Sequence, residues 1–337
     1  MGERLNTERG WAVPGVLLTL ASAAFALVEI PDRSGIVPAL LLLPMWMVAA
    51  GAMACVIVLI ATVRMMLRGA DHPVGYWLGF IVEHRARLLF VTVCMVLTGL
   101  NMITFMWIKP LLNYLVPFWA DPYLASIDRA IFGIDPWRLF GWLNNYPMAI
   151  FYHRAWFALM ILTLLTVLWR PASAEKSAVM LTYFVLWSIF GPAVHTLMPA
   201  AGPVFYARLG YGNAFSGLVS ARETRQLADY LWRTYSGARF GPAAGISAMP
   251  SLHIATTVWM VIAVAIFERR WLVAMIPAAA LIFVLSISLG WHYAIDGFVG
   301  GAGAVLIWYV LHVFMTRASP YSDGKGVAAL ADESIRA

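Results

Sequence analysis

Apolar runs of helix length alternate with short polar segments along the chain of 337 residues. A helix needs about 20 mostly apolar residues to cross the hydrocarbon core of a membrane. Within lipid it also satisfies every backbone N–H and C=O group internally. The pattern therefore predicts an all-α polytopic membrane helix bundle of about eight spans. The runs that fit lie at about residues 11–30, 36–63, 88–108, 148–169, 177–198, 251–267, 271–289 and 294–315.

Three segments depart from this pattern. Residues 109–147 mix charged and apolar positions at helical spacing, which is typical of short amphipathic helices lying on the membrane surface. A loop packed on the bundle explains the same residues equally well. Residues 199–250 form the longest polar section, in which we expect a helix from about Glu223 to Tyr235. The small polar residues of the tail, 317–337, indicate disorder.

The composition supports the membrane assignment. The chain is 62% hydrophobic and 12% charged, whereas soluble domains carry about 25% charged residues. Cys55 and Cys94 lie inside apolar runs and are too few for a disulfide scaffold, and nothing resembles a metal-binding cluster. The net charge of +6 comes from dispersed basic residues, which favours contact with anionic lipid over nucleic acid. We therefore expect a multi-pass integral membrane protein with no metal and no cofactor.

The distribution of lysine and arginine predicts the orientation. Eight spans place both termini on one side of the membrane, and the termini and short loops of that side together hold thirteen of the 23 lysines and arginines. By the positive-inside rule the termini are cytoplasmic. The segment 199–250 then lies on the outer face, periplasmic or lumenal, together with the starts of the runs at 251 and 294.

Two short motifs carry the chemistry. Ser247-Ala-Met-Pro-Ser-Leu-His253 opens one apolar run, and Gly290-Trp-His292-Tyr-Ala-Ile-Asp296-Gly opens another. His292 and Asp296 are four residues apart, so a helix places them on one face. A carboxylate there can fix the tautomer of the imidazole and leave its other nitrogen free to attack.

His253 follows a helix-start signal in which Ser251 is a plausible N-cap. Free N–H groups at such a start favour an anion such as phosphate. A single histidine near the interface is more often a hydrogen-bonded structural group, but ionisable residues within spans are costly and point to function. Together the three residues indicate phosphoryl transfer through a phosphohistidine.

These motifs resemble the second and third signature motifs of the type-2 phosphatidic acid phosphatase superfamily. The variant Ala-Met-Pro-Ser-Leu-His with Trp-His-Tyr-Ala-Ile-Asp is closer to the branch that contains inositol phosphorylceramide synthases. The resemblance covers about residues 85–315 and implies that His292 is the nucleophile, Asp296 its orienting partner and His253 the acid for the leaving group.

The chain departs from the common phosphatase pattern in three places. Leu252 stands where that pattern has glycine, and Ser286 stands where it has arginine. The Lys-x6-Arg-Pro first motif is absent, and Pro199-Ala-Ala-Gly-Pro-Val-Phe-Tyr206-Ala-Arg208 occupies its expected place. The resemblance divides the chain into two accessory N-terminal spans (1–84), a six-span core (85–316) with outer-face loops 109–147 and 199–250, and the tail (317–337).

A phosphate needs cationic and hydrogen-bonding donors in the transition state. The candidates are those polar residues that flank the motifs or interrupt a span, although a solvated or headgroup-facing side chain is the plainer interpretation of each arginine. We expect phosphate binding by Arg208, Arg239, Arg154, Ser251 and Tyr206.

The function expected from these observations is a lipid phosphatase or lipid phosphotransferase that acts on a phospholipid or lipid phosphate without a metal. Its partners would be a membrane lipid and an alcohol acceptor such as inositol or a ceramide-like lipid. The alternative is a non-catalytic lipid transporter or flippase, in which the polar residues form a relay. The sequence names neither the lipid nor the acceptor.

Overall fold

A computed structural model describes residues 2–30, 36–70, 72–239, 241 and 243–317. The tail expected to be disordered, 317–337, lies outside the described residues except for Arg317, which is the last residue of α13. Every regular element that is described is helical, and the all-α prediction is confirmed. The main helices are α1 (Gly2–Glu29), α2 (Ile36–Leu40), α3 (Leu42–Leu67), α4 (Pro73–Leu115), α5 (Asp121–Phe132), α6 (Trp137–Phe140), α7 (Tyr146–Trp169), α8 (Ala174–Val185), α9 (Gly191–Leu197), α10 (Arg222–Ser236), α11 (Leu252–Phe267), α12 (Leu272–Ser288) and α13 (Ala294–Arg317).

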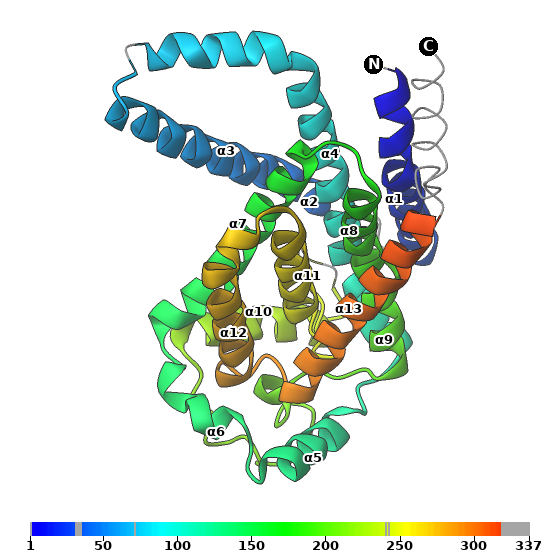
Figure 1. Ribbon diagram of the computed structural model, residues 1–337. Coiled ribbons are helices and arrows are strands. Elements are labelled where there is room, and N and C mark those ends of the chain that lie inside the picture. The colour runs from blue at the N-terminus through cyan, green and yellow to red at the C-terminus, as the bar shows by residue number, and fades with distance from the viewer. Residues whose placement is uncertain (1, 31–35, 71, 240, 242, 318–337) are drawn as a thin grey trace, which may run out of the picture.

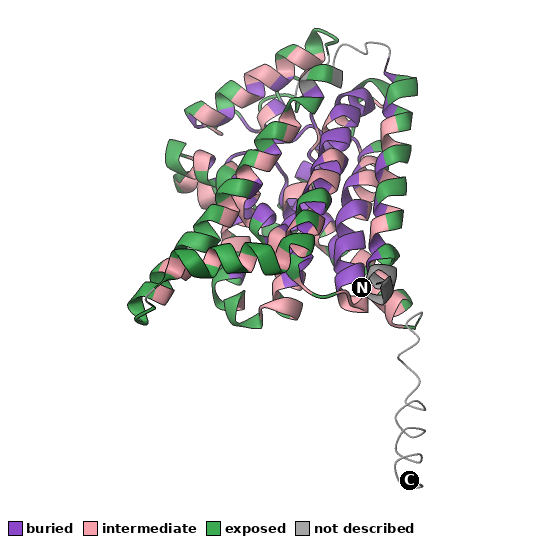
Figure 2. Ribbon diagram, turned by 90° about the horizontal axis from the view of Figure 1, so that it is seen from above, coloured by how far each residue is buried: buried purple, intermediate pink, exposed green. Residues whose placement is uncertain are grey.

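Seven helical stretches among the described residues are long and apolar enough to cross a membrane. One of them, Ala174–Leu197, joins α8 and α9 through a π-helical turn, Leu186–Phe190. The remaining expected span corresponds to α11, which is apolar but has only 16 residues. Large apolar side chains such as Val48, Leu59 and Leu306 are exposed on the outside of the bundle, as lipid-facing positions should be. Figure 2 shows the buried residues gathered in its middle.

The start of α1 and the end of α13 lie at one end of the bundle, and α5 and α6 lie at the other (Figure 1). This arrangement agrees with an even number of crossings. The helix α13 packs along α11 and α8, and α1 packs against α4 and α8. The N-terminal helix is therefore an integral part of the bundle surface.

The helix α4 extends further than the sequence analysis predicted. It continues through Pro110 to Leu115, where the apolar run was expected to end at 108. Leu111 and Leu112 are buried against residues of α1 and α2, and this packing stabilises the extra turns despite the proline. The expected boundary at 109 is therefore wrong, and Lys109 and Asn113 lie on a helix inside the protein.

The segment after α4 packs on the bundle. The helix α5 buries Leu124 and Ala125 together with two acidic residues, Asp121 and Asp128. The two interpretations left open for residues 109–147 are thus each right in part for α5, which is a short helix, as the first predicted, and packs on the bundle, as the second predicted. The helix expected at about 223–235 is confirmed as α10.

Candidate active site

One cavity of about 260 Å³ joins the two histidine motifs. It lies where the C-terminal part of α4 meets the starts of α7 and α11 and the loop before α13. His253 and His292 both line it, and their ring centroids are 6.2 Å apart.

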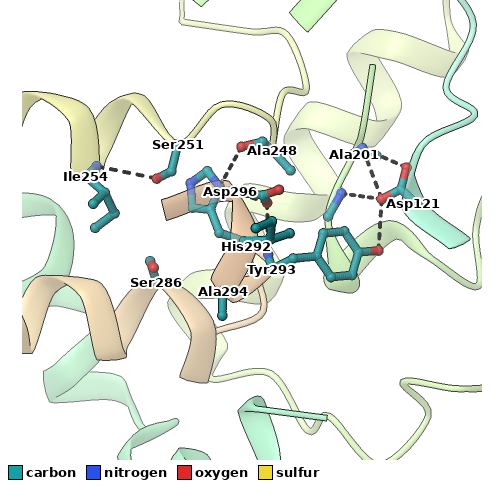
Figure 3. A network of polar contacts seen from close by, with 12 residues as sticks. Asp121, Ala201, Ala248, Ser251, Ile254, Ser286, His292, Tyr293, Ala294 and Asp296 are labelled. Carbon is teal, nitrogen blue, oxygen red and sulfur yellow. Dashed lines mark hydrogen bonds and ion pairs between the residues drawn. The ribbon is translucent and has the colours of Figure 1, made fainter. Parts of the chain in front are cut away.

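The tautomer of His292 is set by a backbone carbonyl. Its Nδ1 lies 2.8 Å from the carbonyl oxygen of Ala248 (Figure 3). A carbonyl oxygen only accepts hydrogen bonds, so Nδ1 carries the proton and donates it. Nε2 is then left with its lone pair, as a nucleophile requires. Ala248 belongs to the motif of His253, so the second motif orients the histidine of the third.

Asp296 is close to the same ring nitrogen but at a longer distance. Its Oδ2 lies 3.6 Å from His292 Nδ1 and accepts a hydrogen bond of 2.9 Å from the backbone N–H of Tyr293. The carboxylate is fully buried, and its Oδ1 has no hydrogen-bond partner. Sequence spacing predicted the proximity of Asp296 to His292. The hydrogen bond itself goes to Ala248, so it is this carbonyl, instead of Asp296, that fixes the tautomer of His292.

His253 lies in an aromatic surround at the start of α11. Its ring stacks on that of Tyr152, with ring centroids 5.0 Å apart. The ring centroid of Trp156, one turn further along α7, lies 4.3 Å from that of His253. The predicted N-cap is confirmed, because Ser251 Oγ accepts a hydrogen bond of 3.4 Å from Ile254 N. The Ser251 N–H donates to the carbonyl of Asp296 at 3.1 Å, which ties the start of α11 to the start of α13.

Lys109 is a cavity residue that the sequence analysis missed. Among the described residues that line the cavity, it is the one lysine or arginine. Its ammonium has no hydrogen-bond or ion-pair partner in the described part of the chain. A signal was present, since Lys109-x6-Val116-Pro117 keeps the lysine and proline of the Lys-x6-Arg-Pro motif with valine for arginine. Without the arginine the segment does not match the full motif, so Lys109 was not among the predicted site residues.

Two glycines bring the loops of the site close together. Gly245 has φ +103°, and a Cβ there would meet the backbone of Lys109 and Pro110 at less than 3 Å. Gly202 has φ +99°, and its Cβ would meet the carbonyl oxygen of Trp291 at 2.4 Å. Both positions therefore need glycine for conformation and for space.

From the start of α7 the structure directs His153, rather than Arg154, into the cavity. His153 lines it, and its Nε2 is buried without a partner. Arg154 is exposed. One helical step separates these neighbours by about 100°, because an α-helix has 3.6 residues per turn, and the apolar pattern does not reveal which of them faces inward.

The other predicted phosphate-binding residues lie apart from the cavity lining. Arg208 pairs with Asp229 and lies over the ring of Trp232. Arg239 is exposed beyond the end of α10. Tyr206 is buried against other aromatic rings. Ser251 lies beside the cavity as a helix cap. Roles for Arg208, Arg239, Arg154, Tyr206 and Ser251 in phosphate binding remain predictions.

Across the described part of the chain, no three histidine, cysteine or acidic side chains gather in a way that could hold a metal ion. A search of curated proteins found no match, and a search of solved structures also found none. A family model described as the PAP2 superfamily matches residues 123–310, which is more than half of the chain and includes both histidine motifs. Together with the paired histidines in one cavity, this match shows that the chain belongs to the PAP2 superfamily.

Proposed function

We propose that this membrane protein transfers the phosphoryl group of a lipid phosphoester through a phosphohistidine at His292. The observation that carries the proposal is the hydrogen bond from His292 Nδ1 to the Ala248 carbonyl, because it leaves Nε2 free to attack within a cavity that His253 shares. Family membership supports a phosphatase-type enzyme. The transporter alternative has no comparable support.

In the first step, Nε2 of His292 attacks phosphorus, and the bond from phosphorus to the lipid oxygen breaks. His253 gives its proton to the departing oxygen, so that an alcohol leaves. The Asp296 carboxylate near Nδ1 stabilises the positive charge that develops on the imidazole. The product of this step is a phosphoramidate on His292.

In the second step, water or an alcohol attacks the phosphoramidate, and the P–N bond breaks. His253, now neutral, accepts the proton of the attacking O–H group. His292 returns to its starting form. The same residues thus support hydrolysis and transfer, and the outcome depends on which hydroxyl compound reaches phosphorus.

We favour a phospholipid diester over a lipid phosphomonoester, in keeping with the synthase-like variant of the motifs. Lys109 is the one lysine or arginine among the described residues that line the cavity, and the backbone N–H groups at the start of α11 lie at the same cavity. These groups, together with His253, are the donors available to the phosphate.

Apolar and aromatic side chains form most of the remaining cavity wall, among them Met102, Phe105 and Trp187. These side chains suit an acyl chain or another lipid tail next to the phosphate. The proposed reaction uses positioned donors in place of a divalent ion. Activity that disappears in EDTA and returns with Mg²⁺ would contradict that part of the proposal.

The test is product analysis with purified protein in detergent, where transport has no meaning. Phosphatidic acid and an inositol phospholipid are supplied separately, with and without inositol or ceramide, and the products are read by mass spectrometry. We expect diacylglycerol from the diester, and we expect His292→Ala to form none. Absence of product from every lipid phosphoester would contradict an enzymatic function.

We further infer that the termini are cytoplasmic and the site faces the outer leaflet, on the basis of the lysine and arginine distribution. Val219 is 78% exposed in the loop before α10. In a Cys55→Ser background, Val219→Cys should react with an impermeant thiol reagent in intact cells. Reaction only after lysis would reverse the orientation.

A further inference from the structure

Two buried carboxylates outside the cavity contact the backbone around His292. Asp121 and Asp128 lie two turns apart on one face of α5, with 0% and 2% of their surfaces exposed. Neither lines the catalytic cavity. Burying a carboxylate is costly unless its oxygens are hydrogen-bonded, so their partners indicate what these residues do.

Asp128 caps a helix to which it does not belong. Its Oδ2 accepts from Ala294 N at 2.7 Å, and its Oδ1 accepts from Ile295 N at 3.0 Å. These are among the first N–H groups of α13, which have no partner within the helix. Asp296 accepts from Tyr293 N. Three consecutive N–H groups directly after His292 are therefore held by carboxylates.

Asp121 connects the other side of the same loop. It accepts hydrogen bonds from Ala201 N at 2.9 Å, Gly202 N at 2.7 Å and the Tyr293 hydroxyl at 3.0 Å (Figure 3). The neighbouring Ala200 carbonyl accepts from Ala248 N at 2.8 Å. The Ala248 carbonyl is the group that orients His292. Asp121 thus binds both the residue after the histidine and the loop that holds its acceptor.

Burial raises the pKa of both Asp121 and Asp128, and the hydrogen bonds from backbone N–H groups oppose that rise. All of the hydrogen bonds described above are donated to the carboxylates. Each aspartate therefore acts as an acceptor that fixes the position of peptide groups.

We propose that Asp121 and Asp128 are positioning residues that hold the loop of His292 and the Ala248 carbonyl in register, so that His292 Nε2 faces the cavity. The inference rests on the proposed role of His292 as nucleophile. It assigns to α5 a part in catalysis at a distance from the substrate. A displacement of about 1 Å in a reacting group can cost on the order of 10²-fold in rate.

The test compares Asp121→Asn and Asp128→Asn with Asp135→Asn. Asp135 lies just after α5 and pairs with Arg129 and Arg138, instead of with peptide groups of the histidine loop. Rapid-quench measurement of adduct formation, with a nitrophenyl phosphodiester as probe, gives the chemical step. Steady-state kinetics give KM, and thermal denaturation in detergent reports folding.

We expect Asp128→Asn and Asp121→Asn to slow adduct formation by about 10–100-fold, with KM close to that of the wild type and Asp135→Asn unchanged. A purely structural role would lower the thermal midpoint and leave the rate per folded molecule intact. Wild-type adduct rates in folded Asp121→Asn and Asp128→Asn would overturn the inference.

Tyr293→Phe serves if the asparagine variants do not fold, because it removes only the hydroxyl that Asp121 binds. Slower adduct formation in Tyr293→Phe supports the inference, and an unchanged rate overturns it. His292→Ala is measured in parallel. An adduct that persists in His292→Ala defeats the proposed function itself, whereas its loss there with normal rates in the aspartate variants defeats only the role of α5.

Discussion

Two groups of buried and half-buried charged and polar side chains lie at different ends of the bundle, and they differ in how completely they are paired. The paired cluster consists of Glu8, Arg87 and Lys176, near the start of α1. The second cluster, which we propose to be catalytic and call the catalytic cluster, consists of Lys109, His153, His253, His292 and Asp296. Both contain a lysine within largely apolar surroundings.

In the paired cluster each charge has partners. Glu8 Oε1 lies 2.6 Å from Lys176 Nζ and 3.2 Å from Arg87 Nη1. The Lys176 ammonium also donates to the carbonyls of Leu168 and Arg170 at 3.1 and 2.9 Å. These contacts join α1, α4, α7 and α8. A buried ion pair with satisfied hydrogen bonds is suited to fixing helices relative to one another.

In the catalytic cluster several polar atoms have no partner among the described residues. They include the Lys109 ammonium, His153 Nε2 and Asp296 Oδ1. An unpaired buried polar group is costly, and Lys109 and His153 line the cavity in which we propose that a phosphate binds. The two clusters thus differ in pairing more than in charge, and we propose that the less completely paired cluster is the one that binds substrate.

The largest effect should come from the nucleophile. Replacing His292 by alanine removes the proposed nucleophile, so turnover should fall on the order of 10⁴–10⁶-fold. The thermal midpoint in detergent should change little. A His292→Ala enzyme with substantial turnover on both lipid and nitrophenyl substrates would contradict the assignment.

His253→Ala should lose more activity on a lipid substrate than on a nitrophenyl substrate. A general acid contributes roughly 10²–10⁴-fold, mainly when the leaving group is a poor one. The variant should lose that much on a lipid substrate, whose alkoxide needs a proton, and less on a nitrophenyl phosphodiester. Equal losses on the two substrates, measured as kcat/KM, would show that His253 does not act as the acid.

One substitution made at both ends tests the comparison directly. Lys109→Met should lower kcat/KM by about 10²–10³-fold, as for loss of one transition-state donor, with no loss of stability. Lys176→Met breaks a buried pair and should cost about 3–5 kcal/mol of stability, with normal kcat in the folded fraction. The reverse pattern in activity and thermal denaturation would invert the roles of the clusters.

The smallest effects should come from the arginines. Arg154, Arg208 and Arg239 do not line the cavity, and surface substitutions usually change stability by less than about 0.5 kcal/mol. We expect each alanine variant to keep most of its kcat/KM. A loss greater than that of Lys109→Met would instead show that an arginine moves onto the phosphate when substrate binds.

Much of the fold could be predicted from the sequence because lipid imposes long apolar helices with few exceptions. The same contrast exposed His253, His292 and Asp296, since ionisable groups at the mouths of apolar runs are conspicuous. The place of Lys109 in the cavity could not be predicted, because Pro110 resembles a helix end and only tertiary packing shows that the helix continues. The role of the Ala248 carbonyl in orienting His292 could not be predicted, because every residue has a backbone carbonyl and no residue type marks this one.

The burial of Asp121 and Asp128 could not be predicted, for a different reason. Charged residues in an amphipathic segment normally face water, so their positions were assigned to a surface. Yet Asp121, Leu124, Ala125 and Asp128 follow one helical face at spacings of three and four residues. The spacing therefore indicates one face of α5, but only the contacts with the loops of the active site show that Asp121 and Asp128, at the two ends of that face, are buried.

The central claim is that His292 carries the phosphoryl group, and trapping of the covalent intermediate tests it most directly. Wild-type protein is mixed with a phosphodiester substrate, quenched within milliseconds under conditions that preserve an acid-labile phosphoramidate, and digested for mass spectrometry. The account predicts an adduct on the peptide that contains His292 and none in His292→Ala. An adduct on His253, or one that persists in His292→Ala, would contradict it.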